Sequence, residues 1–175
     1  MTSLKQSLPA AFLFCLLGFS NSAAAQDPAQ KPDKDVLWQT RCVGTSRTSD
    51  ALICESSQSV RAQENGRLLL KIDIIYPANK ADPVLQMVLP LGIHIPGQVK
   101  LTVDGSAMGD FVIGSCNTQG CFLSAPASPG MIDAMKAGAT LKVDFAPVPG
   151  KRQAIEIPLT GFSRAMAAIQ SQEKR

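Results

Sequence analysis

The cysteines are the residues of this chain whose type and spacing most readily suggest chemistry. Cys116 and Cys121 could exchange thiols or hold a metal ion. However, four residues separate them, whereas thioredoxin-like oxidoreductases use a C-x-x-C motif. A zinc site needs about four ligands, and the only histidine is His94. A structural disulfide is therefore the favoured interpretation of this pair, with redox activity or metal binding as the alternative.

Ser163 and His94 are the remaining candidates for catalysis. Ser163 lies in the pentapeptide Gly-Phe-Ser-Arg-Ala, between a predicted strand and a predicted helix, where a G-x-S-x-G nucleophile elbow would lie. Ala165 replaces the second glycine of that motif, and no histidine follows Ser163 as it does in hydrolases of that fold. His94 has no visible nucleophile to activate. We therefore predict that the protein is not an enzyme and has no catalytic, cofactor-binding or metal-binding residues.

The first 25 residues have the three parts of a cleaved secretory signal peptide. Lys5 precedes an apolar run from Ala10 to Phe19, and three alanines ending at Ala25 supply the small residues at a cleavage site. The apolar run is about half of the roughly 20 residues that a membrane-spanning helix needs, so we expect cleavage after Ala25. The expected organisation is a signal peptide at 1–25, a disordered proline-containing leader at 26–35 and a folded domain at 36–172.

Export changes the interpretation of the cysteines. Removing the signal peptide removes Cys15 and leaves four cysteines, an even number that favours disulfides in an oxidising compartment. Four cysteines allow three connectivities. We favour Cys42–Cys54 and Cys116–Cys121, because each pair flanks a short turn-rich segment that a local hairpin could close. On the chain-entropy model each bridge stabilises the fold by about 2–3 kcal/mol at most.

The charge pattern excludes one class of partner. The chain carries a formal charge of +3, with residues of both signs scattered along it. Nucleic-acid-binding proteins usually cluster their basic residues in a stripe. We therefore expect no nucleic-acid partner.

Alternation of apolar and polar residues is the dominant pattern of the expected domain. It recurs over residues 68–74, 85–89, 99–103, 141–145 and 155–159, and it is typical of strands with one buried face. Turn dipeptides such as Asn-Gly, Asp-Gly and Pro-Gly separate these strands. A shorter strand is predicted at 52–54, and two more are predicted at 111–113 and 121–123, on either side of a turn at 117–120.

Two helices are expected among these strands. Ser128 is placed as an N-cap before Pro129 at the first helical position, and Gly138 is placed to end that helix. A C-terminal helix is predicted over about residues 161–170, where apolar residues recur at helical spacing. The predicted fold is therefore mainly β, an antiparallel β-sandwich that is immunoglobulin-like in general character, with one short helix and a C-terminal helix.

Several motifs, taken in order, resemble those of a known family. Residues 89–105, LPLGIHIPGQVKLTVDG, resemble the segment lPLG-x-x-lp-x-Gv-x-l-x-vDg of the invasion-associated locus B family. The resemblance covers about residues 36–170. The other matching motifs are Trp38 to Cys42 with Cys54 and Gln58 (W-x-x-x-C, C, Q), Cys116 to Cys121 (C-x-x-x-GC), and Leu159 to Ala165 (sL-x-GF-x-x-A).

The resemblance implies an exported protein of alphaproteobacterial type, located in the periplasm or associated with the outer membrane. That family is named for a member linked to the invasion of host cells, and it implies no catalytic residues. We therefore expect a non-enzymatic envelope protein that binds an envelope or host protein or another envelope component, with peripheral outer-membrane association and support of invasion as further expectations. The alternative is a periplasmic thiol oxidoreductase or metal-binding protein that uses Cys116 and Cys121.

Overall fold

The structure is a computed structural model. It describes residues 37–44, 52–78 and 82–173, all of which belong to the unit Pro32–Arg175. The expected signal peptide at 1–25 and leader at 26–35 lie outside the described residues.

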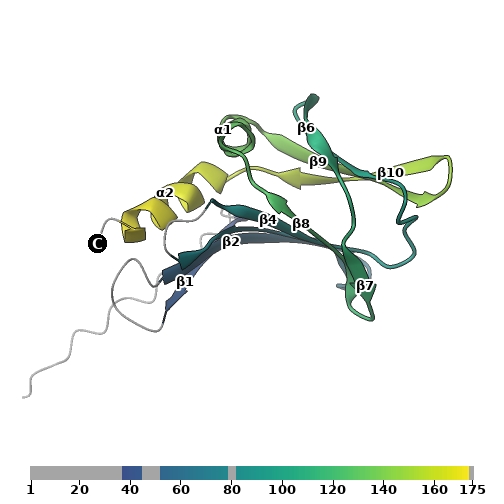
Figure 1. Cartoon of the computed structure of the whole chain (residues 1–175), viewed down its shortest axis with the longest axis horizontal. Helices are drawn as coiled ribbons and strands as arrows, with labels where there is room; N and C mark the ends of the chain where they lie inside the picture. Colours follow the sequence, from purple (N-terminus) through teal and green to yellow (C-terminus); the bar gives the residue numbers. More distant parts are fainter. Residues whose placement is uncertain (1–36, 45–51, 79–81, 174–175) are drawn as a thin grey trace, which may run out of the picture. The chain divides into compact units, whose positions relative to one another are not determined.

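Within the described residues, strands form two antiparallel sheets and two helices accompany them (Figure 1). The larger sheet has the strand order β1-β2-β3-β4-β8-β7, and the smaller sheet has the order β10-β9-β5-β6. This architecture confirms the predicted mainly β antiparallel sandwich with two helices. In chain order the elements are β1 (Gln39–Gly44), β2 (Leu52–Arg61), β3 (Leu68–Tyr76), β4 (Val84–Leu89), β5 (Val99–Val103), β6 (Ser106–Phe111), β7 (Ser115–Asn117), β8 (Gly120–Pro126), α1 (Pro129–Ala137), β9 (Thr140–Val148), β10 (Lys151–Pro158) and α2 (Phe162–Glu173).

The period-two alternation produces this sandwich because each sheet turns one set of side chains inward. Leu70, Ile72 and Ile74 of β3 are fully buried, and the alternating residues of β4, β5 and β9 join them in one core. Burying a large aliphatic side chain stabilises the fold by roughly 1.5–3 kcal/mol. The inner faces therefore hold the sheets together, and the outer face of each sheet is left for other roles.

Two tight turns set the register of the smaller sheet. Asp104 and Gly105 both have positive φ, 47° and 86°, as the two central residues of a type I′ hairpin turn between β5 and β6 require. The Asp104 carboxylate also accepts hydrogen bonds from the backbone N–H groups of Ala139 and Thr140, at 2.8 and 2.9 Å. Pro149 and Gly150 form the predicted turn between β9 and β10. The Asp104 turn is thus also attached to the segment that leads from α1 into β9.

Helix α1 begins and ends where the sequence predicts. The Ser128 side chain accepts a hydrogen bond from the N–H of Met131, and Pro129 occupies the first helical turn. Gly138 ends the helix with φ −85°, so its backbone is open to any residue. Glycine is required there for space, because an added Cβ would lie 2.3 Å from Cγ1 of Val103 on β5.

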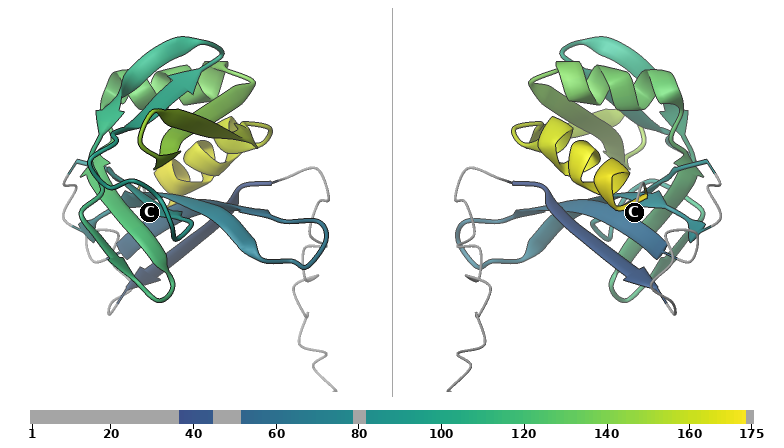
Figure 2. Two further views of the ribbon diagram at one scale, coloured as in Figure 1. Left: turned by 90° about the vertical axis from the view of Figure 1, so that its right-hand side faces the viewer. Right: turned by 90° about the vertical axis from the view of Figure 1, so that its left-hand side faces the viewer.

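Helix α2 closes the inner side of the sandwich over β1 and β2 (Figures 1 and 2). Phe162 is completely buried and meets the ring of Trp38 edge to face, with 4.7 Å between ring centroids. The indole N–H of Trp38 donates to the carbonyl of Pro158 at 3.2 Å. Trp38 therefore connects α2 with the end of β10.

One strand prediction is wrong in its pairing. Residues 111–113 and 121–123 were expected to flank a single turn. The second segment is part of β8, but its hairpin partner is β7, and Phe111 instead ends β6 in the other sheet. Residues 112–114 connect the two sheets. Three apolar residues indicate a strand without indicating the sheet to which it belongs.

Candidate functional site

The four predicted disulfide residues lie at the two edges of the larger sheet. The sulfurs of Cys42 and Cys54 are 2.01 Å apart, and those of Cys116 and Cys121 are 2.07 Å apart. In each pair the two residues are direct cross-strand partners, on β1 with β2 and on β7 with β8. Each edge strand of this sheet is therefore linked to its neighbour by a cross-strand cysteine pair at bonding distance.

The hydroxyl of Ser163 has a structural partner. Its Oγ donates a hydrogen bond of 2.7 Å to the backbone carbonyl of Lys136, in the last turn of α1. Among the described residues, His94 is the only histidine, and it belongs to the loop between β4 and β5, where its backbone N–H donates to the backbone carbonyl of Ala146. Ser163 acts as a tie between the two helices, and this geometry does not form a nucleophile with an adjacent base.

No metal centre is formed by the described part of the chain. No group of three or more His, Cys, Asp or Glu side chains comes together there in a way that could hold an ion. Both members of the Cys116–Cys121 pair lie at disulfide distance from one another. The arrangement therefore gives no support to the alternative of a thiol oxidoreductase or metal-binding protein.

Several of the motif residues that carry the family resemblance lie in the core. Trp38, Cys54, Gln58, Phe162 and Ala165 are all buried. Gln58 projects from β2 toward the interior, and its Oε1 accepts no hydrogen bond from described residues. Leu91 and Ile95 of the same motifs are exposed in the loop between β4 and β5. The buried motif residues therefore identify the fold, and a functional surface has to be sought among exposed residues.

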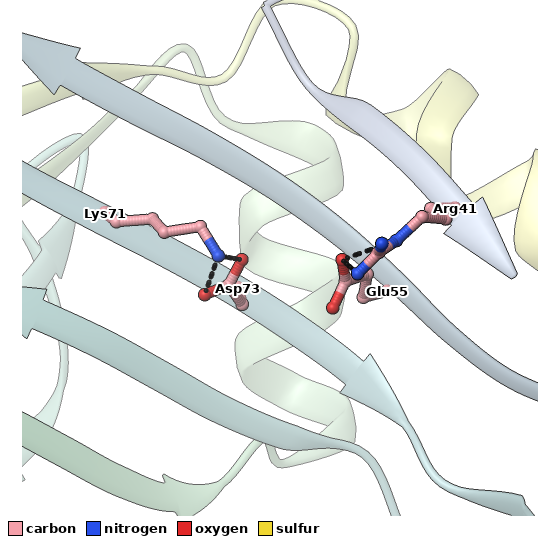
Figure 3. A network of polar contacts seen from close by, with 4 residues as sticks. All are labelled: Arg41, Glu55, Lys71 and Asp73. Carbon is pink, nitrogen blue, oxygen red and sulfur yellow. Dashed lines mark hydrogen bonds and ion pairs between the residues drawn. The ribbon is translucent and has the colours of Figure 1, made fainter. Parts of the chain in front are cut away.

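The outer face of the larger sheet is the best candidate for that surface. Neither described helix covers it, because α1 and α2 both lie on the side of the smaller sheet (Figures 1 and 2). Four charged side chains from β1, β2 and β3 share this face (Figure 3). Arg41 donates to Oε1 of Glu55 through Nε and a terminal nitrogen, at 3.1 and 2.8 Å.

Asp73 is the buried member of this group. Its side chain is 8% exposed, and the Nζ of Lys71 lies 2.9 Å from Oδ2 and 2.8 Å from Oδ1. Only the contact with Oδ2 has hydrogen-bond geometry. Burial raises the pKa of Asp73, Lys71 lowers it through its hydrogen bond and its charge, and the nearby negative charge of Glu55 raises it further. The net result is a raised pKa.

A hollow of about 470 Å³ lies beside this pair. It is formed by β3, β4 and β8 together with the connection from the smaller sheet. Small-ligand sites have volumes of roughly 300–1,000 Å³, so the hollow is large enough for one. Its outward-facing lining consists of Lys71, Asp73, Gln86, Val88, Val112, Ser115, Phe122 and Ser124.

The comparisons with known proteins identify the family. The description "Invasion associated locus B (IalB) protein" belongs to a family whose sequence profile matches residues 38–170. The chain belongs to the IalB family. This result confirms the resemblance seen in the sequence, over almost the same span.

A solved structure shows the same fold. The crystal structure of invasion associated protein B from Bartonella henselae superimposes with a TM-score of 0.68 and 21% sequence identity, over 82% of this chain and 98% of that one. No curated protein sequence matches the chain at a significant level. At this identity the likeness shows that this IalB-family member shares the fold.

Sequence reasoning missed the outer-face site. Alternation placed Lys71 and Asp73 on the outer face of their strand, but nothing marked Asp73 as buried or the neighbouring residues as the wall of a hollow. The Lys-x-Asp spacing is the only local signal, because residues two apart on a strand share a face. Partners from β4, β7 and β8 follow 13 or more residues later, which places them beyond the reach of a local pattern.

Proposed function

We propose that this protein is a non-enzymatic, exported component of the cell envelope that binds another protein or an envelope component. Family membership over residues 38–170 is the observation that carries the proposal. The candidate groups for catalysis support it, since Ser163 is hydrogen-bonded to a backbone carbonyl and the cysteines face one another in pairs. Support of host-cell invasion belongs to the proposal because the Bartonella protein of similar fold is titled invasion associated.

The proposed location is the periplasm, or an association with the outer membrane. Neither helix among the described residues has the length and hydrophobicity needed to cross a membrane. The amino-terminal sequence supports export, with cleavage after Ala25. Fractionation of cells and intact-mass measurement of the protein test this proposal. A mature chain that begins at Gln26 in the periplasmic or outer-membrane fraction is expected, and an uncleaved cytoplasmic chain would contradict it.

Site-specific crosslinking tests the binding function. A photo-crosslinking amino acid at Gln86 places the probe on the exposed outer face of the larger sheet. The same amino acid at Lys142 places it on the exposed outer face of the smaller sheet and is the matched control. We expect one reproducible adduct in intact cells from Gln86 and none from Lys142. Equal labelling from both positions, or no adduct from either, would contradict a dedicated binding face.

An activity assay distinguishes the proposed binding function from the alternative of a thiol oxidoreductase. Reduction of insulin by the purified protein should not exceed that of a buffer control, and Cys116→Ser should leave this result unchanged. If the wild-type protein reduced insulin and the Cys116→Ser variant did not, the protein would instead be a thiol oxidoreductase.

A further inference from the structure

We propose that the outer-face hollow of the larger sheet binds a neutral saccharide. The inference rests on the proposed binding function and names its ligand class. It starts from the kinds of side chain that line the hollow of about 470 Å³ beside Lys71 and Asp73.

The polar lining supplies both donors and acceptors. Gln86 of β4, Ser115 of β7 and Ser124 of β8 are exposed, and no described residue forms a hydrogen bond with their side chains. An amide and two hydroxyls can each donate and accept. A ligand hydroxyl also does both, so a polyhydroxylated ligand matches this set better than a carbonyl, which only accepts, or an ammonium, which only donates.

The charges in the hollow favour an uncharged ligand. Lys71 is the exposed partner of its pair, with 38% of its side chain accessible, while the Asp73 carboxylate is buried beside it within 2.9 Å. The ammonium has three donors, and at least one remains for a ligand oxygen. Because the adjacent carboxylate cancels most of the field of the ammonium, the pair offers a directed hydrogen bond and little net attraction for an anion. Asp73 is a positioning residue in this arrangement, since it holds the lysine and is itself covered.

The remaining wall is apolar. Val88, Val112 and the half-buried ring of Phe122 line the same hollow, and Val112 is 68% exposed. A pyranose ring carries hydroxyls around its rim and C–H groups on its faces, so it can hydrogen-bond to the serines and Gln86 while one face packs on this wall. Binding sites typically combine such an apolar lining with a few polar groups that fix orientation.

A second hollow adjoins the first one at Val88. It has a volume of about 300 Å³ and extends toward Arg67, Thr118 and Gln119. A chain of sugar units that occupied both hollows would pack across Val88. We therefore expect oligosaccharides to bind more tightly than single sugars.

The test uses the oxidised mature protein and sugars of defined structure. Neutral oligomers of hexoses and N-acetylhexosamines are titrated in NMR experiments that follow backbone amides, with inorganic phosphate and glucuronate as charged probes. We expect the neutral oligomers to shift the amides of Ser115, Phe122 and Ser124. Joint replacement Ser115→Ala and Ser124→Ala removes two hydrogen bonds and should weaken binding about tenfold.

Thr102→Ala is the matched control. Thr102 lines a different hollow, on the outer face of the smaller sheet, and its replacement should leave the affinity unchanged. The amide spectra of both variants report directly whether they remain folded.

Three results would overturn the inference. They are binding of phosphate or glucuronate in preference to neutral sugars, unchanged affinity in the double serine variant, and binding of no sugar at all. If no sugar binds but the crosslinked partner at Gln86 persists, the ligand class is wrong while the binding function stands, and the identity of the adduct shows whether a protein occupies the face. If the adduct is also absent, the binding function fails too.

Discussion

At the scale of single residues, Asp73 combines charge and burial in a way that no other described carboxylate does. It lies at the centre of the outer face, between its cross-strand neighbours Ser57 and Gln86. The ammonium of Lys71 offsets part of the cost of burying the carboxylate. The balance between burial and pairing determines how stability depends on pH.

Replacement of Asp73 by Asn should reveal that dependence. The unfolded chain releases the proton at the ordinary pKa of an aspartate, whereas the folded protein holds it to a higher pH because burial raises the pKa of Asp73. Between the two pKa values the folded state binds more protons, so the free energy of unfolding falls as pH rises through that window. Asn cannot titrate. The wild type should therefore lose stability relative to Asp73→Asn as pH rises above the ordinary aspartate pKa of 3.8, as measured by urea unfolding.

Asp133→Asn is the control for this comparison, since Asp133 is an exposed carboxylate on α1 with a 3.5 Å contact to Lys136. We expect the pH-dependent difference to be larger at Asp73 than at Asp133. A difference between wild type and Asp73→Asn that is constant with pH would show that pairing with Lys71 balances burial, and a difference that changes in the opposite direction would show that pairing outweighs burial.

For single residues, the sequence correctly predicted the face of the strand on which a side chain lies. It did not predict which neighbouring side chains cover that side chain. Alternation correctly put Lys71 and Asp73 on the face opposite Leu70 and Ile72. It could not show that Asp73 is buried, because Gln86 comes from another strand and Lys71 folds back over the carboxylate. Burial of a polar side chain on an outer face depends on neighbours that a periodic pattern does not contain.

At the scale of elements, the two helices are attached to each other and to the sheets through a few specific contacts. The Ser163 hydroxyl joins α2 to the last turn of α1, and Trp38 joins α2 to the end of β10. These contacts hold together two helices that are separated in the sequence by β9 and β10.

Replacement of Ser163 by Ala should weaken the attachment of the helices. It removes one hydrogen bond and leaves the Lys136 carbonyl without this donor, so the free energy of unfolding should fall by about 1 kcal/mol. Ser171→Ala is the matched control, because Ser171 bonds locally to the carbonyl of Ala168 within α2 and its loss should cost less than about 0.5 kcal/mol. Chemical denaturation measures both. Equal effects would show that Ser163 does not tie the helices.

Two glycines of the α1 region should respond in opposite directions to alanine. Gly138→Ala places a methyl 2.3 Å from Val103 on β5, so the backbone or the valine must move, at a cost of about 1–3 kcal/mol. Gly130→Ala adds a methyl in open space within the helix and should stabilise it by about 0.5–1 kcal/mol. Thermal unfolding of the two variants gives the sign directly. Stabilisation by Gly138→Ala would mean that α1 is not packed against β5 as described.

Element-level prediction worked where the signal was local. Ser128, Pro129 and Gly138 mark the ends of α1 within the sequence itself, and the Asp104-Gly105 turn fixes a hairpin. The prediction for residues 111–113 failed because the chain changes sheets there. Membership of a sheet is decided by pairing with distant strands.

At the scale of the whole molecule, the position of each cysteine pair follows from the strand order of the larger sheet. The larger sheet joins β4 to β8 and the smaller joins β5 to β9, pairings that cross between segments far apart in sequence. No local pattern predicts this order, although the fold class and the hairpins could be predicted. The two cysteine pairs bracket the sheet, one at each edge.

Peptide mapping tests the pairing. A tryptic digest of the oxidised protein should contain residues 42–47 joined to residues 48–61, and a single peptide 101–136 two hydrogens lighter than its reduced form. A link between 48–61 and 101–136 would join Cys54 to Cys116 or Cys121 and overturn the cysteine pairing of the two sheet edges. Replacing both cysteines of a pair by serine should cost about 3 kcal/mol for the pair separated by 12 residues and about 2 kcal/mol for the pair separated by 5.

The pairing also bears on how the protein could mature during secretion. Each pair joins cysteines that are neighbours in sequence, Cys42 with Cys54 and Cys116 with Cys121, within a single strand pair. In the proposed export, the chain would emerge from the membrane amino terminus first, so Cys54 would follow Cys42 before either later cysteine appears, and Cys121 would then follow Cys116. A thiol oxidase that joins cysteines in their order of arrival would therefore form the native pairs directly, without a disulfide isomerase to correct them.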